Sequence, residues 1–221
     1  MSEIKTNLKS PIKSNPVVPK LSDPLRQIEP TELKKAMIET VKLLVKDRGM
    51  IYQELSGTEM GSKISKTIDW LYGPANHSSL LLQGVPGTGK TTILWAIYNL
   101  FSAANASMSL TSATTLFEAF TAQNSGGSWA YDEYRRMNRL CIDDLGAEPS
   151  RCLLYGVEYT PIQTLLSYRY DKQLPTVITT NLSDQMIRER YGERISDRFS
   201  EMCTILRFSG TSYRKSLIII K

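Results

Sequence analysis

Apolar residues in the central and C-terminal parts of the chain alternate between short runs and helical spacing. The short runs, typical of buried strands, lie at 80–83, 108–111, 140–143, 176–180 and 204–208. Helical periodicity lies between them, at 91–103, 113–122, 129–137, 160–170 and 183–200. Alternating strands and helices predict a parallel sheet with helices on both faces. The expected fold is therefore an α/β three-layer sandwich.

The N-terminal part has a different pattern. Residues 1–30 hold five prolines and five Lys or Arg residues but few apolar ones, which predicts a flexible basic arm. A linker remnant without function explains this segment equally well. Thr31 is a candidate N-cap for a helix that ends near Gly49, and a less regular helical stretch ends at Gly73. We therefore expect an arm at 1–30, a helical extension at 31–73 and the α/β domain at 74–221.

A phosphate-binding loop lies between the first predicted strand and the helix that follows it. Residues 84–91 match G-x-x-x-x-G-K-[ST] in full. The glycines let backbone N–H groups surround phosphate oxygens, and the helix N-terminus adds its dipole. Lys90 would reach the β- and γ-phosphates, and the Thr91 hydroxyl would ligate Mg²⁺. ATP and Mg are the expected cofactors, and the expected nucleotide-contacting residues here are Gly84, Val85, Pro86, Gly87, Thr88, Gly89, Lys90, Thr91 and Thr92.

Polar residues end two further predicted strands. Asp143 and Asp144 follow one apolar run, and Asn181 follows another. The carboxyl ends of parallel strands share one edge of the sheet, where the phosphate loop also lies. Asp143 would hold Mg²⁺, Asp144 would orient or deprotonate the attacking water, and Asn181 would hydrogen-bond the γ-phosphate and that water. Taken singly, such residues are also common in solvated turns.

Residues 188–198 contain four arginines and three acids. For Arg188 and Arg190 we expect a solvated, self-paired helix face. Arg194 and Arg198 are four residues apart and so share one helix face. Arginine suits a developing phosphoryl charge because its guanidinium is planar and always ionised.

These motifs occur together in a fixed order. After the phosphate loop come Asp-Asp-Leu-Gly-Ala-Glu at 143–148, Thr-Thr-Asn-Leu at 179–182, Gly-Glu-Arg-Ile-x-Asp-Arg at 192–198 and Ser-Tyr-Arg at 212–214. Over roughly residues 70–215, the set resembles the AAA+ ATPases of the DnaC/DnaI helicase-loader group and the closely similar IstB transposition helpers.

The resemblance implies a P-loop NTPase (AAA+) fold whose five parallel strands have the order 5-1-4-3-2, without a C-terminal lid domain. It implies Walker A at 84–91, Walker B at Asp143 and Asp144, and sensor 1 at Asn181. The implied arginine finger is Arg198, with Arg194 as second choice, and sensor 2 is Arg214. Many AAA+ proteins have Glu in place of Asp144, so hydrolysis is expected to be slow, with Glu148 as a possible substitute base.

Aromatic and basic residues are interleaved ahead of Walker B. Stacking combined with phosphate pairing is how proteins hold single strands. We therefore expect single-stranded DNA to contact Trp129, Arg135, Arg136 and Arg139. A core stripe formed by Tyr131, Tyr134 and Met137 is the alternative. The net charge of +5 is compatible with nucleic-acid contact but is weak support for it.

Composition excludes several classes of protein. No apolar run approaches the roughly 20 residues of a membrane-spanning helix, and the N-terminus lacks a secretory h-region, so a cytoplasmic protein without membrane contact is expected. Three cysteines without C-x-x-C spacing and a single histidine give no disulfide framework or zinc site.

The leading functional hypothesis is an ATPase that loads a replicative helicase on DNA. A helper of a DNA transposase has the same motifs, and an ATP-locked adaptor with negligible hydrolysis is the alternative of another class. Because the matching arginine of AAA+ relatives reaches a neighbouring subunit, we expect a homo-oligomer when ATP is bound.

Overall fold

A computed structural model describes residues 25–47, 59–73, 78–124, 129–210 and 213. These residues form a five-stranded, fully parallel sheet in the order β2-β3-β6-β1-β7. The strands are β1 (Ser79–Gly84), β2 (Ser109–Ser112), β3 (Leu140–Leu145), β6 (Thr176–Thr180) and β7 (Cys203–Phe208). Numbered along the chain as first to fifth, they have the order 5-1-4-3-2, which confirms the AAA+ topology expected from the resemblance.

The central strands are buried on both faces. Along β1, Leu80 and Leu82 point into one core and Leu81 into the other. In β6, Val177 and Ile178 are divided between the two cores in the same way. Apolar residues on both sides of a strand are typical of a parallel sheet between helical layers.

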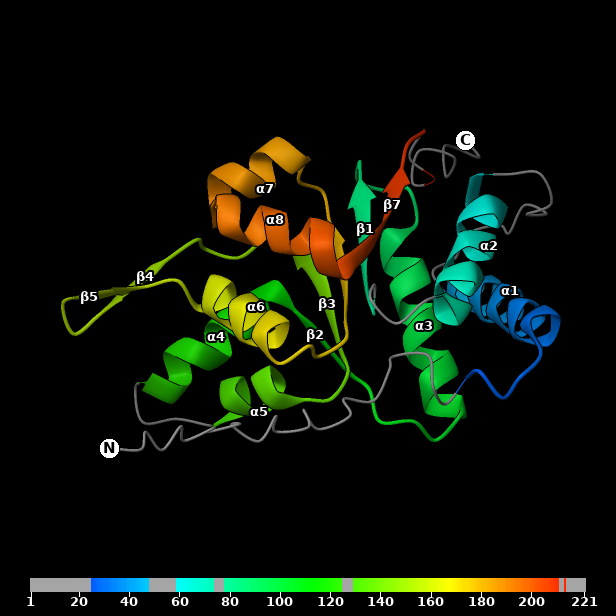
Figure 1. The fold of residues 1–221 in the computed structure, drawn as a ribbon, viewed down its shortest axis with the longest axis horizontal. Coiled ribbons are helices and arrows are strands. Elements are labelled where there is room, and N and C mark those ends of the chain that lie inside the picture. The colour runs from blue at the N-terminus through cyan, green and yellow to red at the C-terminus, as the bar shows by residue number, and fades with distance from the viewer. Residues whose placement is uncertain (1–24, 48–58, 74–77, 125–128, 211–212, 214–221) are drawn as a thin grey trace, which may run out of the picture.

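Two helical layers cover the sheet (Figure 1). One layer holds α1 (Pro30–Asp47), α2 (Glu59–Tyr72) and α3 (Lys90–Ala103), which share a core with one face of the sheet. The other layer holds α4 (Ala113–Asn124), α5 (Ala130–Arg136), α6 (Pro161–Asp171), α7 (Asp184–Tyr191) and α8 (Glu193–Met202). The three-layer sandwich is therefore confirmed.

Two helices, α1 and α2, lie in the region expected for the N-terminal helical extension. Leu33, Met37 and Val41 of α1 are buried at helical spacing, and Ile64 and Leu71 of α2 join the same core. Residues 1–24 of the expected arm and the expected domain boundary at residue 74 lie outside the described residues.

A two-stranded hairpin was not predicted from the sequence. Strands β4 (Cys152–Leu154) and β5 (Val157–Tyr159) pair antiparallel and extend away from the body of the molecule (Figure 1). Tyr155 and Gly156 both have positive φ, 53° and 80°, as a two-residue type I′ turn requires. Apolar side chains are exposed on this hairpin, including Leu153 at 71% and Tyr155 at 88%.

A buried arginine connects the helical layer of α4 to α8 with the end of the sheet at which the strands begin. Arg169 of α6 is fully buried, and its guanidinium donates to the carbonyl oxygens of Tyr134, Arg135, Met137 and Pro175. Its Nε atom also donates to Thr176 Oγ1 at 2.9 Å. Burial lowers the pKa of this guanidinium to about 9, so it remains charged at neutral pH.

Candidate active site

The phosphate loop joins β1 to α3 in the geometry that anion binding needs. The N-cap of α3 is Gly89, at φ 92°, which has no side chain to occupy the first-turn N–H groups. The first turn of α3 also carries no acidic residue. The backbone N–H groups and the positive end of the helix dipole are therefore directed at the loop.

Lys90 lies over the same loop. Its side chain is buried, and Nζ donates to the carbonyl oxygens of Gly84 and Val85, each at 2.8 Å. An anionic phosphate oxygen is a stronger partner for an ammonium group than a neutral carbonyl. Lys90 is thus placed to exchange these carbonyls for phosphate oxygens.

Neighbouring segments pack closely against the loop. A Cβ on Gly84 would lie 2.0 Å from the Phe208 carbonyl oxygen, so β7 can pass here only beside a glycine. The Tyr213 N–H donates to the Gly87 carbonyl at 2.9 Å. The terminal methyl of Met60 in α2 covers Gly89. The N-terminal extension and the end of the described chain therefore both contact the phosphate loop.

Asp143 connects the loop to the neighbouring strands. Its Oδ1 atom accepts hydrogen bonds from Thr91 Oγ1 at 3.0 Å and from Thr179 Oγ1 at 2.6 Å. Hydroxyl and carboxylate oxygens side by side are the hard ligands that Mg²⁺ prefers. No group of three or more His, Cys, Asp or Glu side chains gathers for a metal within the described ranges. Mg²⁺ in proteins commonly takes one or two carboxylates together with water and substrate phosphates.

Asp144 lies at a β-bulge-like shift in the pairing of β3 with β6. The register between β3 and β6 shifts between Ile142 and Leu145, and Asp144 has φ 53°, in the left-handed region. Thr179 Oγ1 accepts the Asp144 N–H at 2.8 Å and so supports this backbone conformation. Bulges often redirect a side chain next to an active site. The exposed side chains of Asp144 and Asn181 lie at the ends of paired strands.

Glu148 is occupied by internal contacts. Its side chain is fully buried, with Oε2 accepting the Gly146 N–H at 2.8 Å and Oε1 accepting the Tyr191 hydroxyl. Burial, and then the nearby Glu148 carboxylate, raises the pKa of Tyr191. Both carboxylate oxygens of Glu148 are therefore engaged inside the protein, whereas the Asp144 side chain is exposed.

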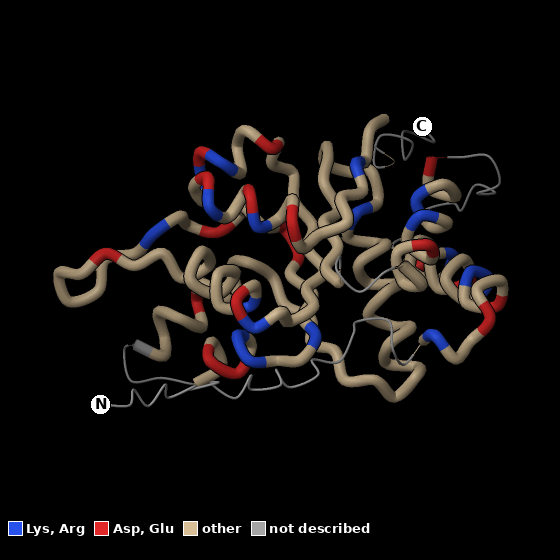
Figure 2. Tube along the Cα trace, viewed as in Figure 1, with Lys and Arg blue, Asp and Glu red and all other residues tan. Residues whose placement is uncertain are grey.

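The expectation for Arg190 was wrong. Rather than lying on a solvated face, Arg190 donates to the Glu148 carbonyl, and its Nη2 lies 3.6 Å from Glu148 Oε1. Arg188 does pair with an acid of its own segment, Glu193, at 3.9 Å. Figure 2 shows acidic and basic positions interspersed along α7 and α8. The sequence alone could not show that one of these arginines turns inward.

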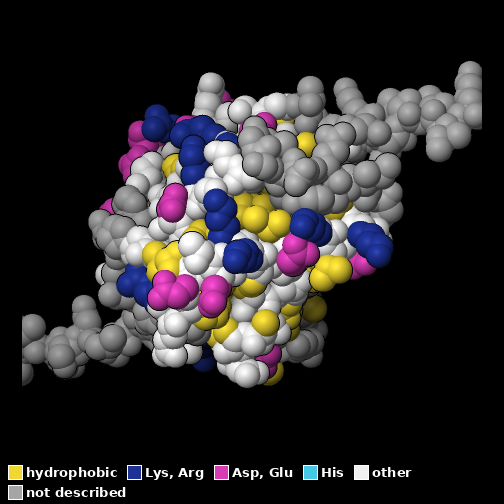
Figure 3. Space-filling model, turned by 90° about the vertical axis from the view of Figure 1, so that its right-hand side faces the viewer, with side chains coloured by type: hydrophobic (Ala, Val, Ile, Leu, Met, Phe, Trp, Pro, Cys, Tyr) yellow, Lys and Arg dark blue, Asp and Glu magenta, His cyan; other side chains and the backbone are white. Residues whose placement is uncertain are grey.

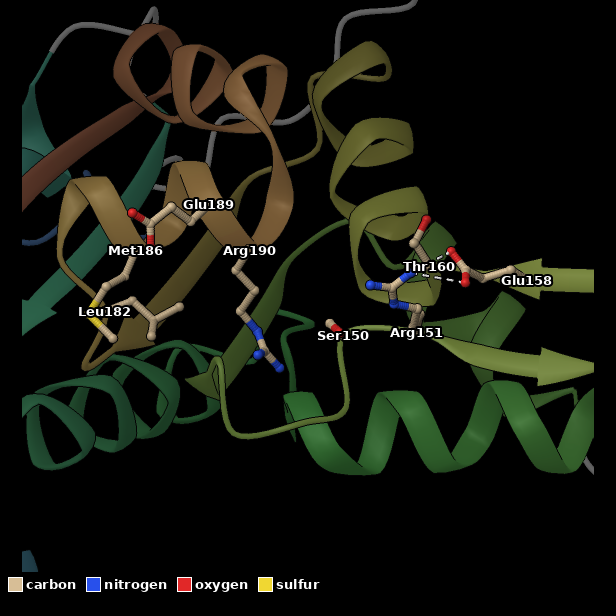
Figure 4. A pocket seen from close by; sticks show the side chains of 8 residues that line it. All are labelled: Ser150, Arg151, Glu158, Thr160, Leu182, Met186, Glu189 and Arg190. Atoms are coloured by element: carbon tan, nitrogen blue, oxygen red, sulfur yellow. Dashed lines mark hydrogen bonds and ion pairs between the residues drawn. The ribbon is translucent and has the colours of Figure 1, made fainter.

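An open groove of about 470 Å³ lies beside these contacts. Ser150, Arg151 and Glu158 line it from the hairpin side, and Met186 and Arg190 line it from α7 (Figure 4). In Figure 4 the Arg190 side chain points from α7 toward the segment that leads into the hairpin.

The two candidate finger residues have different environments. Arg198 is 8% exposed, its Nη2 donates to Asp171 Oδ1 at 2.8 Å, and its guanidinium lies over the Tyr170 ring. Arg194 is exposed one turn earlier in α8. Arg198 is therefore held by contacts with α6, whereas Arg194 faces solvent. Arg214 lies outside the described residues.

The four expected DNA-contacting residues do not form one surface. Arg139 is buried, donates to the Ser107 carbonyl and lies over the Phe101 ring. Arg135 pairs with Asp132 and lies over the Tyr168 ring. Trp129, at 70%, and Arg136 are exposed.

Tyr131, by contrast, belongs to the core. It is 3% exposed and donates to the Pro161 carbonyl at 2.7 Å, in agreement with the core-stripe alternative. The segment also precedes β3, so it lies at the opposite edge of the sheet from the phosphate loop (Figure 1).

The outer surface near α1 and α2 is of mixed character. In Figure 3, basic side chains on the described part of this face stand among acidic and apolar ones. Within the described helices, none combines the length and hydrophobicity needed to cross a bilayer.

Comparison with known proteins gives one family and several solved structures of similar fold. The family model described as IstB-like ATP binding protein matches residues 57–217. The DnaC helicase loader is 20% identical with a TM-score of 0.56, over 72% of this chain and 94% of that one. DnaI is 26% identical with a TM-score of 0.50, over 59% and 73%. AMPPCP-bound DnaA from Aquifex aeolicus is 17% identical with a TM-score of 0.52, over 76% and 51%. No curated protein sequence matches.

Proposed function

Because this chain belongs to the family of IstB-like ATP-binding proteins, we propose that it hydrolyses ATP at the sheet edge where β1, β3 and β6 end. The observation that carries the proposal is the hydrogen-bonded set formed by Thr91, Asp143 and Thr179 beside the phosphate loop. These oxygen ligands come from the start of α3 and from the ends of β3 and β6. In sequence, Asp143 is 52 residues from Thr91 and 36 residues from Thr179.

Each residue of the site has a role in this proposal. The loop N–H groups and Lys90 bind the phosphates, and Thr91 and Asp143 hold Mg²⁺. When bound, the metal neutralises charge on the transferred phosphoryl group. Asp144 accepts the proton of the attacking water, and Asn181 orients that water.

The direct test measures phosphate release and nucleotide binding separately. Asp144→Asn should bind a fluorescent ATP analogue as the parent does but release phosphate at least about 100-fold more slowly, because an amide cannot accept the proton. A parent protein that binds ATP but releases no phosphate in a single-turnover assay would be an ATP-locked adaptor. Normal turnover by Asp144→Asn would contradict its role as the base.

The arginine that completes the site comes, in this proposal, from a second copy of the chain. The exposed Arg194 is the better candidate because Arg198 is held by Asp171 and Tyr170. Two inactive proteins, Lys90→Ala and Arg194→Ala, should regain activity when mixed, because some interfaces then pair an intact loop with an intact arginine. Mixed oligomers without activity would contradict a shared site. A second mixture of Lys90→Ala with Arg198→Ala tests the arginine finger that the sequence resemblance implied first.

The partner in this proposal is a replicative helicase, which the protein loads on DNA. The fold similarity to the DnaC helicase loader supports it. The IstB-like family assignment favours the second candidate, an ATPase helper of a transposase. Affinity capture with the Asp144→Asn protein in ATP, which should hold the ATP-bound complex, distinguishes the two by whether a helicase or a transposase is retained. Trp129 and Arg136, the two exposed members of the expected set, are the DNA contacts to substitute first.

A further inference from the structure

One buried carboxylate joins the turn after Asp144 to the start of helix α8. Glu148 accepts the Gly146 N–H with one oxygen and the Tyr191 hydroxyl with the other. Tyr191 is the last residue of α7, and α8 begins two residues later, after Gly192 at φ 83°. The side chain of Glu148 therefore connects the turn at Gly146, which follows the Walker B acids, with the junction between α7 and α8. Arg194 lies in the first turn of α8.

The connection is tight because its members are buried and packed. Glu148 has no exposed side-chain surface, and Tyr191 is 3% exposed. A Cβ on Gly146 would lie 2.7 Å from the Leu182 side chain, so the turn also fits closely against the segment after β6. Arg190 Nη2 also lies 3.6 Å from Glu148 Oε1, and removing a hydrogen-bond donor from a buried carboxylate is costly. Glu148 is therefore the direct hydrogen-bonded link between the Gly146 turn and Tyr191.

The other end of α7 is fixed to the same edge of the sheet. Asp184, its first residue, accepts Gln83 Nε2 at 2.8 Å from β1 and an Arg207 Nη2 hydrogen bond at 2.7 Å from β7. Helix α7 is thus held at its start by the strands flanking the phosphate loop and at its end by the Walker B turn. Contacts with α6 hold the same region: Gln163 Nε2 donates to the Tyr191 carbonyl at 2.6 Å, and Arg198 of α8 donates to Asp171.

We propose that Glu148 is a positioning residue that couples the nucleotide state of the Asp144 turn to the placement of α8 and its exposed arginine. The proposal rests on the ATPase function proposed above and assigns Glu148 no contact with substrate. When ATP and Mg²⁺ engage Asp143 and Asp144, the following turn moves with them. Through Glu148 and Tyr191, α8 then adopts the position in which Arg194 serves a neighbouring copy.

Two conservative variants break the connection, and one matched variant does not. Tyr191→Phe removes the hydroxyl that donates to Glu148 Oε1 and accepts a hydrogen bond from Arg190 Nε at 3.3 Å. Glu148→Gln keeps the shape but leaves one oxygen to serve two donors. Tyr131→Phe is the control, because Tyr131 is also 3% exposed and its hydroxyl donates a buried hydrogen bond of 2.7 Å to the Pro161 carbonyl, without touching Glu148.

The decisive measurement is amide hydrogen exchange with and without a non-hydrolysable ATP analogue. The analogue should protect residues 84–92 in the parent and in all three variants. It should protect 184–202 about tenfold in the parent and in Tyr131→Phe but less than about twofold in Tyr191→Phe and Glu148→Gln, since a coupling of this size is common. Equal protection of 184–202 in all four proteins would overturn the proposal.

Failure of the coupling is distinguishable from failure of the ATPase proposal. A parent in which the analogue leaves 84–92 unprotected would contradict ATP binding itself. A parent protected at 84–92 but unchanged at 184–202 would refute only the coupling. Steady-state kinetics adds a second readout: Tyr191→Phe should lower kcat about tenfold with KM changed less than about threefold, as expected when an interaction made only in the transition state is lost. Unchanged kcat in Tyr191→Phe would also refute the proposal.

Discussion

Thr179 is the residue on which both Walker B acids depend. Its hydroxyl donates to Asp143 Oδ1 at 2.6 Å and accepts the Asp144 N–H at 2.8 Å, and the residue is fully buried. Thr179→Val keeps the shape of the side chain and removes both hydrogen bonds. A hydrogen bond to a charged group contributes about 1.5–3 kcal/mol, and a buried N–H left unsatisfied costs about 1–3 kcal/mol. Valine recovers part of this by burying a methyl group. We therefore expect the free energy of unfolding to fall by about 2–4 kcal/mol.

The same strand offers a matched control. Thr176 of β6 is also buried, accepts a hydrogen bond from the charged Arg169 Nε at 2.9 Å and donates to the Leu174 carbonyl at 3.0 Å. Thr176→Val should therefore cost about the same 2–4 kcal/mol in urea-induced unfolding. It lies at the opposite end of the strand from the proposed metal site, so it should leave that site intact.

ATP hydrolysis as a function of Mg²⁺ concentration separates the two variants. Thr179→Val leaves Asp143 Oδ1 with the Thr91 hydroxyl but without Thr179, and it removes the acceptor of the Asp144 N–H. The variant should therefore raise the Mg²⁺ concentration for half-maximal activity and lower kcat at least about tenfold, a loss of about 1.4 kcal/mol in transition-state stabilisation. Thr176→Val should show parental values once the folded fraction is matched. Equal losses of activity in both variants would mean that Thr179 acts only through stability, and the reasoning from its two hydrogen bonds would be refuted.

Three further predictions follow from the described contacts. Lys90→Ala should weaken binding of a fluorescent ATP analogue at least about 100-fold, because the charged contact to the phosphates is lost; unchanged affinity would contradict the nucleotide site. Arg169→Met should lower the free energy of unfolding by about 3 kcal/mol or more, because buried carbonyl groups lose a charged donor; chemical denaturation measures this, and a loss below about 1 kcal/mol would contradict it. Arg198→Ala should reduce the melting temperature, whereas the exposed Arg194→Ala should not; the reverse order in a thermal scan would show that their environments are misassigned.

The sheet and the arrangement of the nucleotide site were predictable because the signals for them are local. Each core strand is a short apolar run, and the phosphate loop is a complete motif between a strand and a helix. Once the strands are parallel, their carboxyl ends must meet. The proximity of Thr91 to Asp143 therefore followed from topology, although their sequence positions are far apart.

What the sequence could not supply depends on long-range packing. Arg190 and Arg188 lie on the same short helix with similar neighbours, and only the position of Glu148 turns one of them inward. Arg169 gives no sign in the sequence that backbone carbonyls from α5 surround it. The hairpin was missed because its strands have three residues each and its turn uses Tyr155 where Asn is the usual signal.

The order of strands also affects how the protein is made on the ribosome. Strand β1, which leads into the phosphate loop, pairs on one side with β6 and on the other with β7. In the pairing register, β6 follows β1 by 97 residues (Leu80 with Val177) and β7 follows it by 124 (Ser79 with Cys203). Parallel pairings between such distant segments form slowly. A nascent chain that contains the phosphate loop but not β6 and β7 therefore lacks the two strands that pair with β1 and position the loop. We therefore expect ATP to bind only to chains that extend through Phe208, the residue of β7 that packs against Gly84.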